Sequence, residues 1–233
     1  MQIIESTALG VRSAIFRLRA PDAGPDFVLF PMVHIGAPAY YEEIERRLSN
    51  CDLILYEGVR SRTITLLTRA YRLMGSNRRL GLVQQSSMKL DRLKDRMVHS
   101  DVSAESFESR WRLVPAWMRI LIYLIAPTLG LYLRWFATRQ FIAKHLGMDD
   151  RKSADEILAD DDIEKLQEVT VNWRDRHLVT VIEQHRGRYK TSEACIGVLY
   201  GASHMRAVLR HLIGRHRYYV TSSAWVTVFD LDG

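Results

Sequence analysis

The chain has 233 residues, of which 47% are hydrophobic, and this composition excludes a globally disordered protein. Its length fits one large domain, or one domain that carries an insertion. The net charge of +6 is mild and no run of five basic residues occurs, so we expect a solvated basic surface and no nucleic-acid partner.

The first third of the chain predicts a strand, a turn and then a βαβ unit. Residues 11–18 have the pattern of a strand. The continuous apolar runs 27–33 and 53–56 are typical of strands that are covered on both faces. A helix is expected between them, over residues 38–48, with Pro38 in its first turn. Strand, helix and strand at this spacing indicate parallel strands.

The middle of the chain, residues 60–150, is rich in Arg and Leu and mostly helical in pattern, which predicts a helical insertion (lid) over the sheet. Residues 113–135 are almost entirely apolar, but the uninterrupted run between Arg119 and Arg134 is only 14 residues, the length of a core helix. We therefore expect residues 120–133 to pack on their own domain or on a second subunit of a homodimer. Peripheral membrane contact through residues 113–135 is the first alternative, and a membrane span the second.

The last third repeats the βα pattern. A capping box at residues 153–156 precedes a long helix over 163–184, and a strand is expected at 196–200. Two β-rich segments near the C-terminus, joined by Ser222 and Ser223, predict a closing hairpin. The sequence therefore predicts a single α/β domain over residues 1–233, with a mainly parallel central sheet built from βα units, a C-terminal β-hairpin and the helical insertion.

Three of the predicted strands are followed by an ionisable residue. His34 and Glu57 come directly after their strands, and His204 comes shortly after the strand at 196–200. Ligands of open parallel sheets bind beyond the carboxyl ends of the strands, so we expect these three side chains to converge on one site. Two histidines and a carboxylate form a common metal-ligand set, although each residue alone could equally be a structural hydrogen-bonding or ion-pairing group.

Arg174 is a fourth candidate for this site. It shares a helix face with Val171, Leu178 and Val181, so its side chain is predicted to point with the apolar stripe. A buried guanidinium needs a carboxylate or a ligand as its partner. A structural ion pair and a functional role are both compatible with this pattern.

The two cysteines and the N-terminal residues indicate the cellular compartment of the protein. Cys51 and Cys195 stand next to apolar runs without zinc-binding spacing, which favours buried thiols in a reducing compartment, with a disulfide between them as the alternative. The N-terminal residues lack the order of a secretory signal. We expect a cytoplasmic protein, with membrane association left open by residues 113–135.

These residues resemble the motifs of the TraB/PrgY/GumN group and its relatives, the Tiki metalloproteases, the erythromycin esterase-like proteins and the ChaN-like proteins. The group carries two GxxH motifs, a Glu-Gly pair and a late Arg-Asn pair. The matching segments here are Pro31-Met32-Val33-His34, Glu57-Gly58, Gly201-Ala202-Ser203-His204 and Arg174-Asp175, with Gly81-Leu82-Val83-Gln84 and His99-Ser100-Asp101 similar to middle segments of the group. Pro31 replaces the first glycine and Asp175 replaces the asparagine.

The resemblance covers residues 27–220 and implies a parallel-sheet core with a site made from the His, Glu and Arg positions. For Tiki-like members it also implies metal-dependent peptide hydrolysis. We therefore expect a metal-dependent hydrolase that acts on a peptide, ester or amide substrate and uses a divalent metal, Mn²⁺ or Co²⁺ by resemblance.

Roles in such a hydrolase follow from the residue types. His34 and His204 would hold the ion, Glu57 would be a ligand or the general base, and Arg174 would stabilise developing negative charge. Other candidates for the same site are Gly201, Gln84 and Asp101. The alternative function is a non-catalytic protein on the same fold that binds haem, iron or a peptide.

Overall fold

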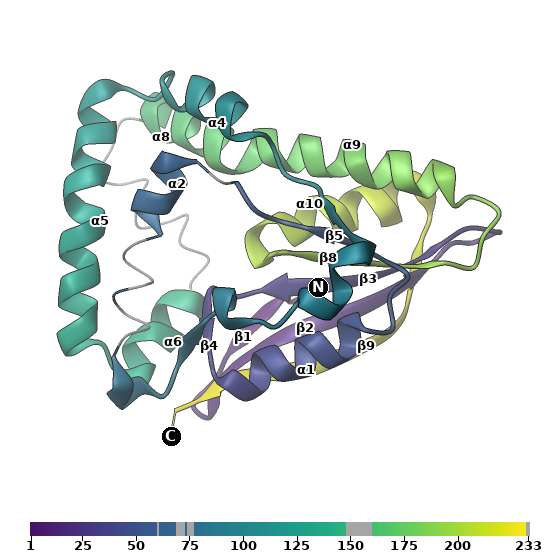
Figure 1. Ribbon diagram of the computed structural model, residues 1–233, viewed down its shortest axis with the longest axis horizontal. Helices are drawn as coiled ribbons and strands as arrows, with labels where there is room; N and C mark the ends of the chain where they lie inside the picture. The colour runs from purple at the N-terminus through teal and green to yellow at the C-terminus, as the bar shows by residue number, and fades with distance from the viewer. Residues whose placement is uncertain (60, 69–72, 74–76, 148–159, 232–233) are drawn as a thin grey trace.

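A mixed, seven-stranded sheet forms the centre of the computed structural model, which describes residues 1–59, 61–68, 73, 77–147 and 160–231 (Figure 1). The strand order is β1-β2-β3-β8-β5-β7, and β9 also pairs with β2. The bounds are β1 Ile4–Ser6, β2 Gly10–Arg19, β3 Asp26–Met32, β5 Leu53–Tyr56, β7 Met97–His99, β8 Cys195–Gly201 and β9 Tyr219–Asp230. The α/β class predicted from the sequence is confirmed.

Four neighbouring strands, β3, β8, β5 and β7, run parallel. Their registers place Pro31 beside Tyr200, and Tyr56 beside both Leu199 and His99. All seven residues of β8 are buried, as expected for a central parallel strand covered on both faces. The carboxyl ends of the four strands therefore meet at one edge of the sheet.

The antiparallel part of the sheet is built around β2. One edge of β2 pairs with β9 along its whole length, and the other pairs first with β1 and then with β3. The predicted C-terminal hairpin is wrong, because its two segments form the single strand β9. Ser222 and Ser223 lie inside that strand, opposite Arg17 and Phe16. Both serines are exposed, so an outer strand tolerates them while β2 supplies its hydrogen bonds.

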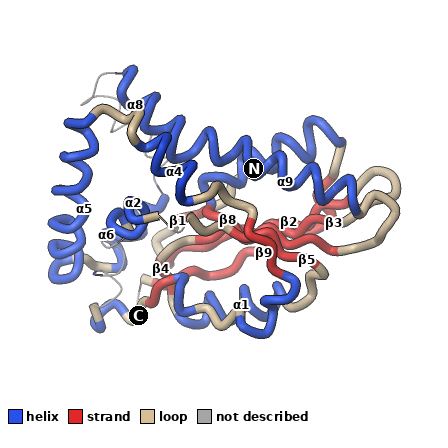
Figure 2. The backbone as a smooth tube through the Cα atoms, turned by 45° about the horizontal axis from the view of Figure 1, so that its top comes forward, coloured by secondary structure: helices blue, strands red, loops and turns tan. Residues whose placement is uncertain are grey.

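Helices cover both faces of the parallel strands (Figure 2). On one face α1 (Pro38–Leu48) contributes Tyr40, Tyr41 and Ile44 to the core, and on the other face lie α9 (Trp173–Arg188) and α10 (Met205–Leu209). The other α-helices within the described residues are α2 Arg62–Leu67, α4 Ala104–Trp111, α5 Ala116–Phe136, α6 Arg139–Gly147 and α8 Asp160–Gln167.

Two π-turns interrupt the helices, η4 (Glu168–Asn172) between α8 and α9 and η6 (Arg210–Arg215) after α10. A small second sheet pairs β4 (Ile35–Gly36) with β6 (Val83–Gln84). The short 3₁₀ segments are η1 Arg78–Leu80, η2 Gln85–Ser87, η3 Asp91–Arg96 and η5 Ala202–His204.

The segment 60–150, predicted to be a helical insertion, is only partly helical. It contains α2, α4, α5 and α6, but it also supplies β6 and the sheet strand β7. β7 was missed because it has only three residues, Met97–His99, too few to show an apolar run. The predicted capping box at 153–156 lies outside the described residues.

Helix α5 stands apart from the sheet (Figure 1). Most of its large apolar side chains are exposed. It is long and apolar enough to cross a membrane by length and composition alone, and 11% of its most hydrophobic window is buried. Ile120, Leu124 and Trp135 are each more than half exposed. Most of residues 120–133 therefore do not pack on their own domain, which was the first of the two expected arrangements; packing on a second subunit stays a prediction. Only an inner stripe that includes Met118 and Gly130 is buried.

The two cysteines are buried, free thiols in the structure. Cys51 lies between α1 and β5, Cys195 begins β8, and their Sγ atoms are 3.8 Å apart. This agrees with the expected pair of small buried residues.

Candidate functional site

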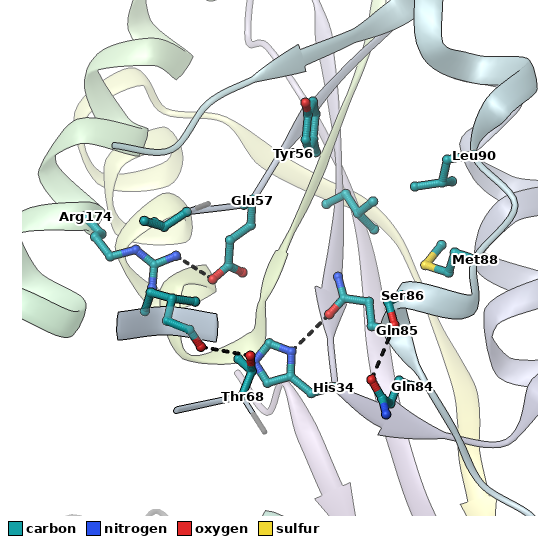
Figure 3. Close-up of a pocket in the computed structure, with 14 residues that line it drawn as sticks. His34, Tyr56, Glu57, Thr68, Gln84, Gln85, Ser86, Met88, Leu90 and Arg174 are labelled. Atoms are coloured by element: carbon teal, nitrogen blue, oxygen red, sulfur yellow. Dashed lines mark hydrogen bonds and ion pairs between the residues drawn. The ribbon is translucent and has the colours of Figure 1, made fainter. Parts of the chain in front are cut away.

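A pocket of about 400 Å³ opens where β5 and β8 end (Figure 3). One side of it is apolar and includes Tyr56, Met88 and Leu90. Its polar lining comes from His34, Glu57, Thr68, Gln84, Gln85, Ser86 and Arg174. Four of the candidates from the sequence therefore line one cavity: His34, Glu57, Gln84 and Arg174.

Glu57 is the pocket's central charged group. It follows β5, and its carboxylate reaches across to the neighbouring strand, where the backbone N–H of Gly201 donates to Oε2 at 2.6 Å. A Cβ atom at position 201 would lie 3.1 Å from the same oxygen, so a glycine here lets the carboxylate approach the backbone.

Burial acts to raise the pKa of Glu57, but the charge of Arg174, aided by His204 and His34, outweighs it and holds that pKa below its ordinary value. The carboxylate is therefore kept ionised.

Arg174 binds two carboxylates at once. Its Nη2 lies 2.5 Å from Glu57 Oε1 and 2.6 Å from Asp101 Oδ2, and its Nε donates to Asp101 Oδ1 at 3.1 Å. Burial acts to lower the pKa of Arg174, but the hydrogen bond to Asp101 and the charge of Glu57 raise it above its ordinary value. The sequence prediction that Arg174 points inward is confirmed, since the residue is only 8% exposed.

Asp101 also organises the backbone around the pocket. It lies just beyond β7, and its side chain is fully buried. Its two oxygens accept hydrogen bonds from the backbone N–H groups of Gly58 and Val102. With three donor groups holding it, Asp101 fixes the guanidinium of Arg174 rather than facing the pocket.

His204 lies behind Glu57 and does not line the pocket. It ends the 3₁₀ turn η5 and is 3% exposed. Its Nδ1 is 2.6 Å from Asp175 Oδ1, and its Nε2 is 3.8 Å from Glu57 Oε1. With Nδ1–H donating to Asp175, the neutral ring carries its lone pair on Nε2, toward Glu57.

His34 comes from the opposite wall of the pocket and is exposed. Its Nδ1 is 3.1 Å from Gln85 Oε1, and its backbone carbonyl accepts from the N–H of Gln85. The β4–β6 pairing places Gln84 beside Ile35 and so brings this segment next to His34. The side-chain oxygen of Gln85, Oε1, can only accept a hydrogen bond, so Nδ1 is the nitrogen that carries the proton in a neutral His34.

The three residues expected to be metal ligands thus do not all lie close to one another. Glu57 and His204 approach each other, whereas the ligand atoms of His34, Glu57 and His204 do not all lie within 4.8 Å of one another. Among the described residues, the one group that meets this distance is Glu183, His211 and His216, which sequence reasoning missed.

Asp175 and Gln85 are two further residues at the site whose contacts were not predicted. Asp175 appeared in the sequence only as a departure from an Arg-Asn pair, but it is the hydrogen-bond partner of His204. The sequence did offer a signal for Asp175, because this carboxylate directly follows Arg174, which was predicted to point inward. Gln85 had no signal, because its contact with His34 depends on the short β4–β6 pairing.

Comparisons with models of known families, with curated proteins and with solved structures find no match to this chain. The resemblance to the TraB/PrgY/GumN group remains a prediction from its motifs.

The buried ion cluster predicts a large stability effect at Arg174. Arg174→Leu leaves Glu57 and Asp101 buried without a counter-charge, and we expect it to lower the free energy of unfolding by about 3–5 kcal/mol. Urea unfolding near neutral pH measures this. Arg176→Leu is the matched control, since Arg176 pairs with Glu168 on the exposed side of the same region, and it should cost less than about 1 kcal/mol. Equal effects of the two substitutions would contradict the cluster's role.

The lowered pKa of Glu57 predicts a pH dependence. Ionised Glu57 stabilises the folded state, because the folded state binds fewer protons at this residue than the unfolded state does. This stabilisation is complete above pH 4.5, the ordinary pKa of a glutamate, and is lost as the pH falls through the lower pKa of Glu57 in the folded protein. Glu57→Gln should therefore be less stable than the parent near neutral pH, and the difference should shrink below about pH 4. Urea unfolding at several pH values checks this, and a constant difference would refute it.

Proposed function

We propose that the chain is a metal-dependent hydrolase that acts on a peptide, ester or amide bond. The observation that carries the proposal is the meeting of Glu57 and His34 on one pocket at the carboxyl edge of parallel strands, with His204 directly behind Glu57. Ligand sites of open α/β sheets lie at this edge.

The residues around Glu57 fit a divalent cation in charge and in donor type. Two carboxylates, Glu57 and Asp101, share the guanidinium of Arg174, and a third, Asp175, is paired with His204, so the carboxylates outnumber the guanidinium. Metal-binding histidines usually donate their second nitrogen to an oxygen acceptor, and both His204 and His34 have such an acceptor at Nδ1. Glu57 and His204 would hold the ion, Mn²⁺ or Co²⁺ by the resemblance.

Such an ion would supply a Lewis acid that polarises the carbonyl group of the substrate. The lowered pKa of Glu57 suits a ligand that must stay ionised better than a general base, for which the best pKa lies near the working pH. Of the two roles that the sequence left open for Glu57, we therefore assign it that of a ligand.

His34 is the proton acceptor in this proposal. A water in the pocket loses a proton to Nε2 of His34 as its oxygen bonds to the carbonyl carbon, and the C–N or C–O bond of the substrate then breaks. The leaving group takes up the proton from the imidazolium, so His34 is restored. Gln85 keeps the ring in the required tautomer through its contact with Nδ1.

Arg174 acts in this proposal as a positioning residue. Its N–H groups are largely engaged with Asp101, Glu57 and the carbonyl of Thr170, so it holds Glu57 in place more directly than it binds substrate. Asp175 has the same relation to His204.

The pocket indicates the substrate's character. A volume of about 400 Å³ is at the small end for ligand sites, so it takes one or two residues of a peptide or a small ester. The apolar wall around Tyr56 and Met88 suits an apolar substituent, and Gln84 and Ser86 supply polar contacts at the other wall.

The hydrolase proposal predicts activity that depends on the ion and on two side chains. With Mn²⁺ or Co²⁺ added, the purified protein should cleave some members of a panel of chromogenic peptides, esters and amides, and a chelator should stop it. We expect Glu57→Gln to lose metal-dependent activity and His34→Ala to lower kcat by about 10²–10⁴ fold, because a general base is removed. His177→Ala, a histidine of α9 outside the site, should keep the parent's activity.

Two results would contradict the proposal. One is the absence of hydrolysis of every substrate class with either ion. The other is equal activity of the parent and Glu57→Gln. A haem absorption band or tight peptide binding without turnover would instead favour the binding-protein alternative.

We also propose that the protein is cytoplasmic and rests on an anionic membrane surface through α5. Both ends of α5 are held by the same domain: Met118 packs with Trp111 and Val169, and after the helix Arg139 donates to the carbonyls of Leu80 and Asp230. A helix tied in this way can lie along a bilayer but not across it. No acidic residue occurs between positions 113 and 147, which suits anionic headgroups.

The membrane proposal predicts binding to lipid vesicles. The protein should sediment with vesicles that contain phosphatidylglycerol more than with pure phosphatidylcholine. Leu124→Glu should reduce this binding by about tenfold or more, because burying one leucine contributes about 2 kcal/mol. Leu9→Glu changes a leucine outside α5 that is at least as exposed as Leu124, and it is the control. A dimer in size-exclusion chromatography that Leu124→Glu dissociates would show that a second copy covers α5 instead.

A further inference from the structure

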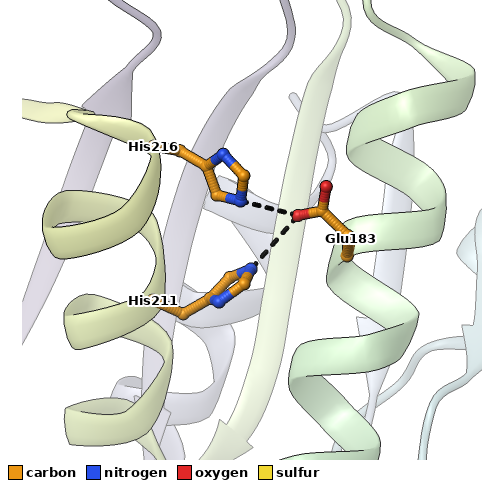
Figure 4. A group of neighbouring side chains, drawn as sticks. All are labelled: Glu183, His211 and His216. Carbon is orange, nitrogen blue, oxygen red and sulfur yellow. Dashed lines mark hydrogen bonds and ion pairs between the residues drawn. The ribbon is translucent and has the colours of Figure 1, made fainter.

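A second cluster of metal-binding side chains lies away from the pocket, between α9 and the end of η6 (Figure 4). Glu183 comes from α9, His211 from η6, and His216 directly follows η6. One ligand atom from each lies within 4.8 Å of the other two. The Nε2 atoms of both histidines point at one oxygen, Glu183 Oε2, at 3.2 Å for His211 and 2.7 Å for His216.

The π-turn explains why the two histidines face the same way. Five residues along an α-helix would leave two side chains about 140° apart. A π-turn closes its hydrogen bonds over five residues, so positions 211 and 216 come to the same side. Arg217 then adopts a left-handed backbone conformation, φ 57°, and ends the turn. Such π-turns are rare and occur frequently at functional sites.

The hydrogen bonding of the cluster is incomplete. His216 Nε2 is buried and makes no hydrogen bond, although Glu183 Oε2 is close, because the direction of approach is unfavourable. A nitrogen in this position is unsatisfied by the carboxylate alone. An ion bound between the three side chains would use the lone pairs of both Nε2 atoms and of Oε2 together.

Arg186 fixes the carboxylate from the other side. Its Nη2 donates to Glu183 Oε1 at 2.6 Å and its Nε donates to Oε2 at 3.1 Å. The outer partner of a ligating carboxylate usually orients it in this manner. Oε2 is thereby directed toward the histidines.

We propose that Glu183, His211 and His216 form a Zn²⁺ site. Two histidines and one glutamate are a known zinc ligand set in which the fourth position is left to water or another ligand. Ligand atoms about 2.1 Å from a tetrahedral ion lie about 3.4 Å apart, so the observed separations need to open by only a few tenths of an ångström around His211 and somewhat more around His216. The ion ties α9 to the connection that leads into β9.

The zinc site is independent of the proposed hydrolase site. Glu183 lies nine residues beyond Arg174 on the same helix, which is about 13 Å along its axis. None of the three zinc ligands lines the pocket that contains Glu57.

Zinc titration in competition with a chromophoric chelator tests the site. We expect the parent to bind Zn²⁺, and His211→Ala and His216→Ala each to weaken this binding by at least about tenfold. His177→Ala on the same helix should bind as the parent does. His204→Ala should also keep the zinc site, which separates it from an ion held near Glu57. Circular dichroism confirms that each variant is folded.

A second measurement uses the unaltered chain and does not depend on folding of the variants. Zn²⁺ should protect His211 and His216, but not His177, from diethyl pyrocarbonate, as read by mass spectrometry of peptides. The proposal is overturned if His211→Ala and His216→Ala bind Zn²⁺ as tightly as His177→Ala does, or if zinc protects neither histidine from the reagent.

Discussion

The guanidinium of Arg174 holds together two carboxylates, Glu57 and Asp101, that come from the ends of different strands. All three side chains are at least 85% buried, so water is a poor replacement for the guanidinium as the partner of either carboxylate. Breaking such a cluster leaves an uncompensated charge, which is far costlier than replacing the whole cluster by apolar groups. The position of α9 over the strand ends is therefore coupled to the position of Glu57.

The ends of β3 and β8 differ in a way that follows from one residue each. Gly201 has no Cβ, so the carboxylate of Glu57 can reach its backbone N–H. Pro31, which precedes His34 by three residues as Gly201 precedes His204, has no N–H to offer, and its carbonyl instead accepts from the hydroxyl groups of Ser13 and Tyr40. Of these two strand ends, only that of β8 thus holds a carboxylate through its backbone N–H. His34 faces this carboxylate from a segment that the β4–β6 pairing fixes.

The sequence predicted three of the four parallel strands, β3, β5 and β8, because each has a continuous apolar run. It predicted the inward direction of Arg174 because of the apolar helix face that this residue shares. It did not predict β7, whose three residues carry no such run, nor the partner of His204, since that contact joins two distant helical segments. The cluster of Glu183, His211 and His216, the proposed zinc site, had a weaker signal in the sequence. His211 and His216 have a spacing found in zinc sites, but Glu183 lies far from both in the sequence, and an ordinary helix would have separated the two histidines.

Composition alone gives α5 the character of a membrane span, but its flanking segments determine what its apolar surface can contact. Trp111 and Val114 before the helix pack into a cluster with Val59, which lies three residues beyond the end of β5. Ile142 and Ala143 after it pack into the core beneath β2. A bilayer between these two anchors would have to divide one folded domain. The exposed leucines of α5 are therefore available to a surface that lies beside the protein, such as a lipid headgroup layer or a second copy, and not to a membrane that the chain crosses.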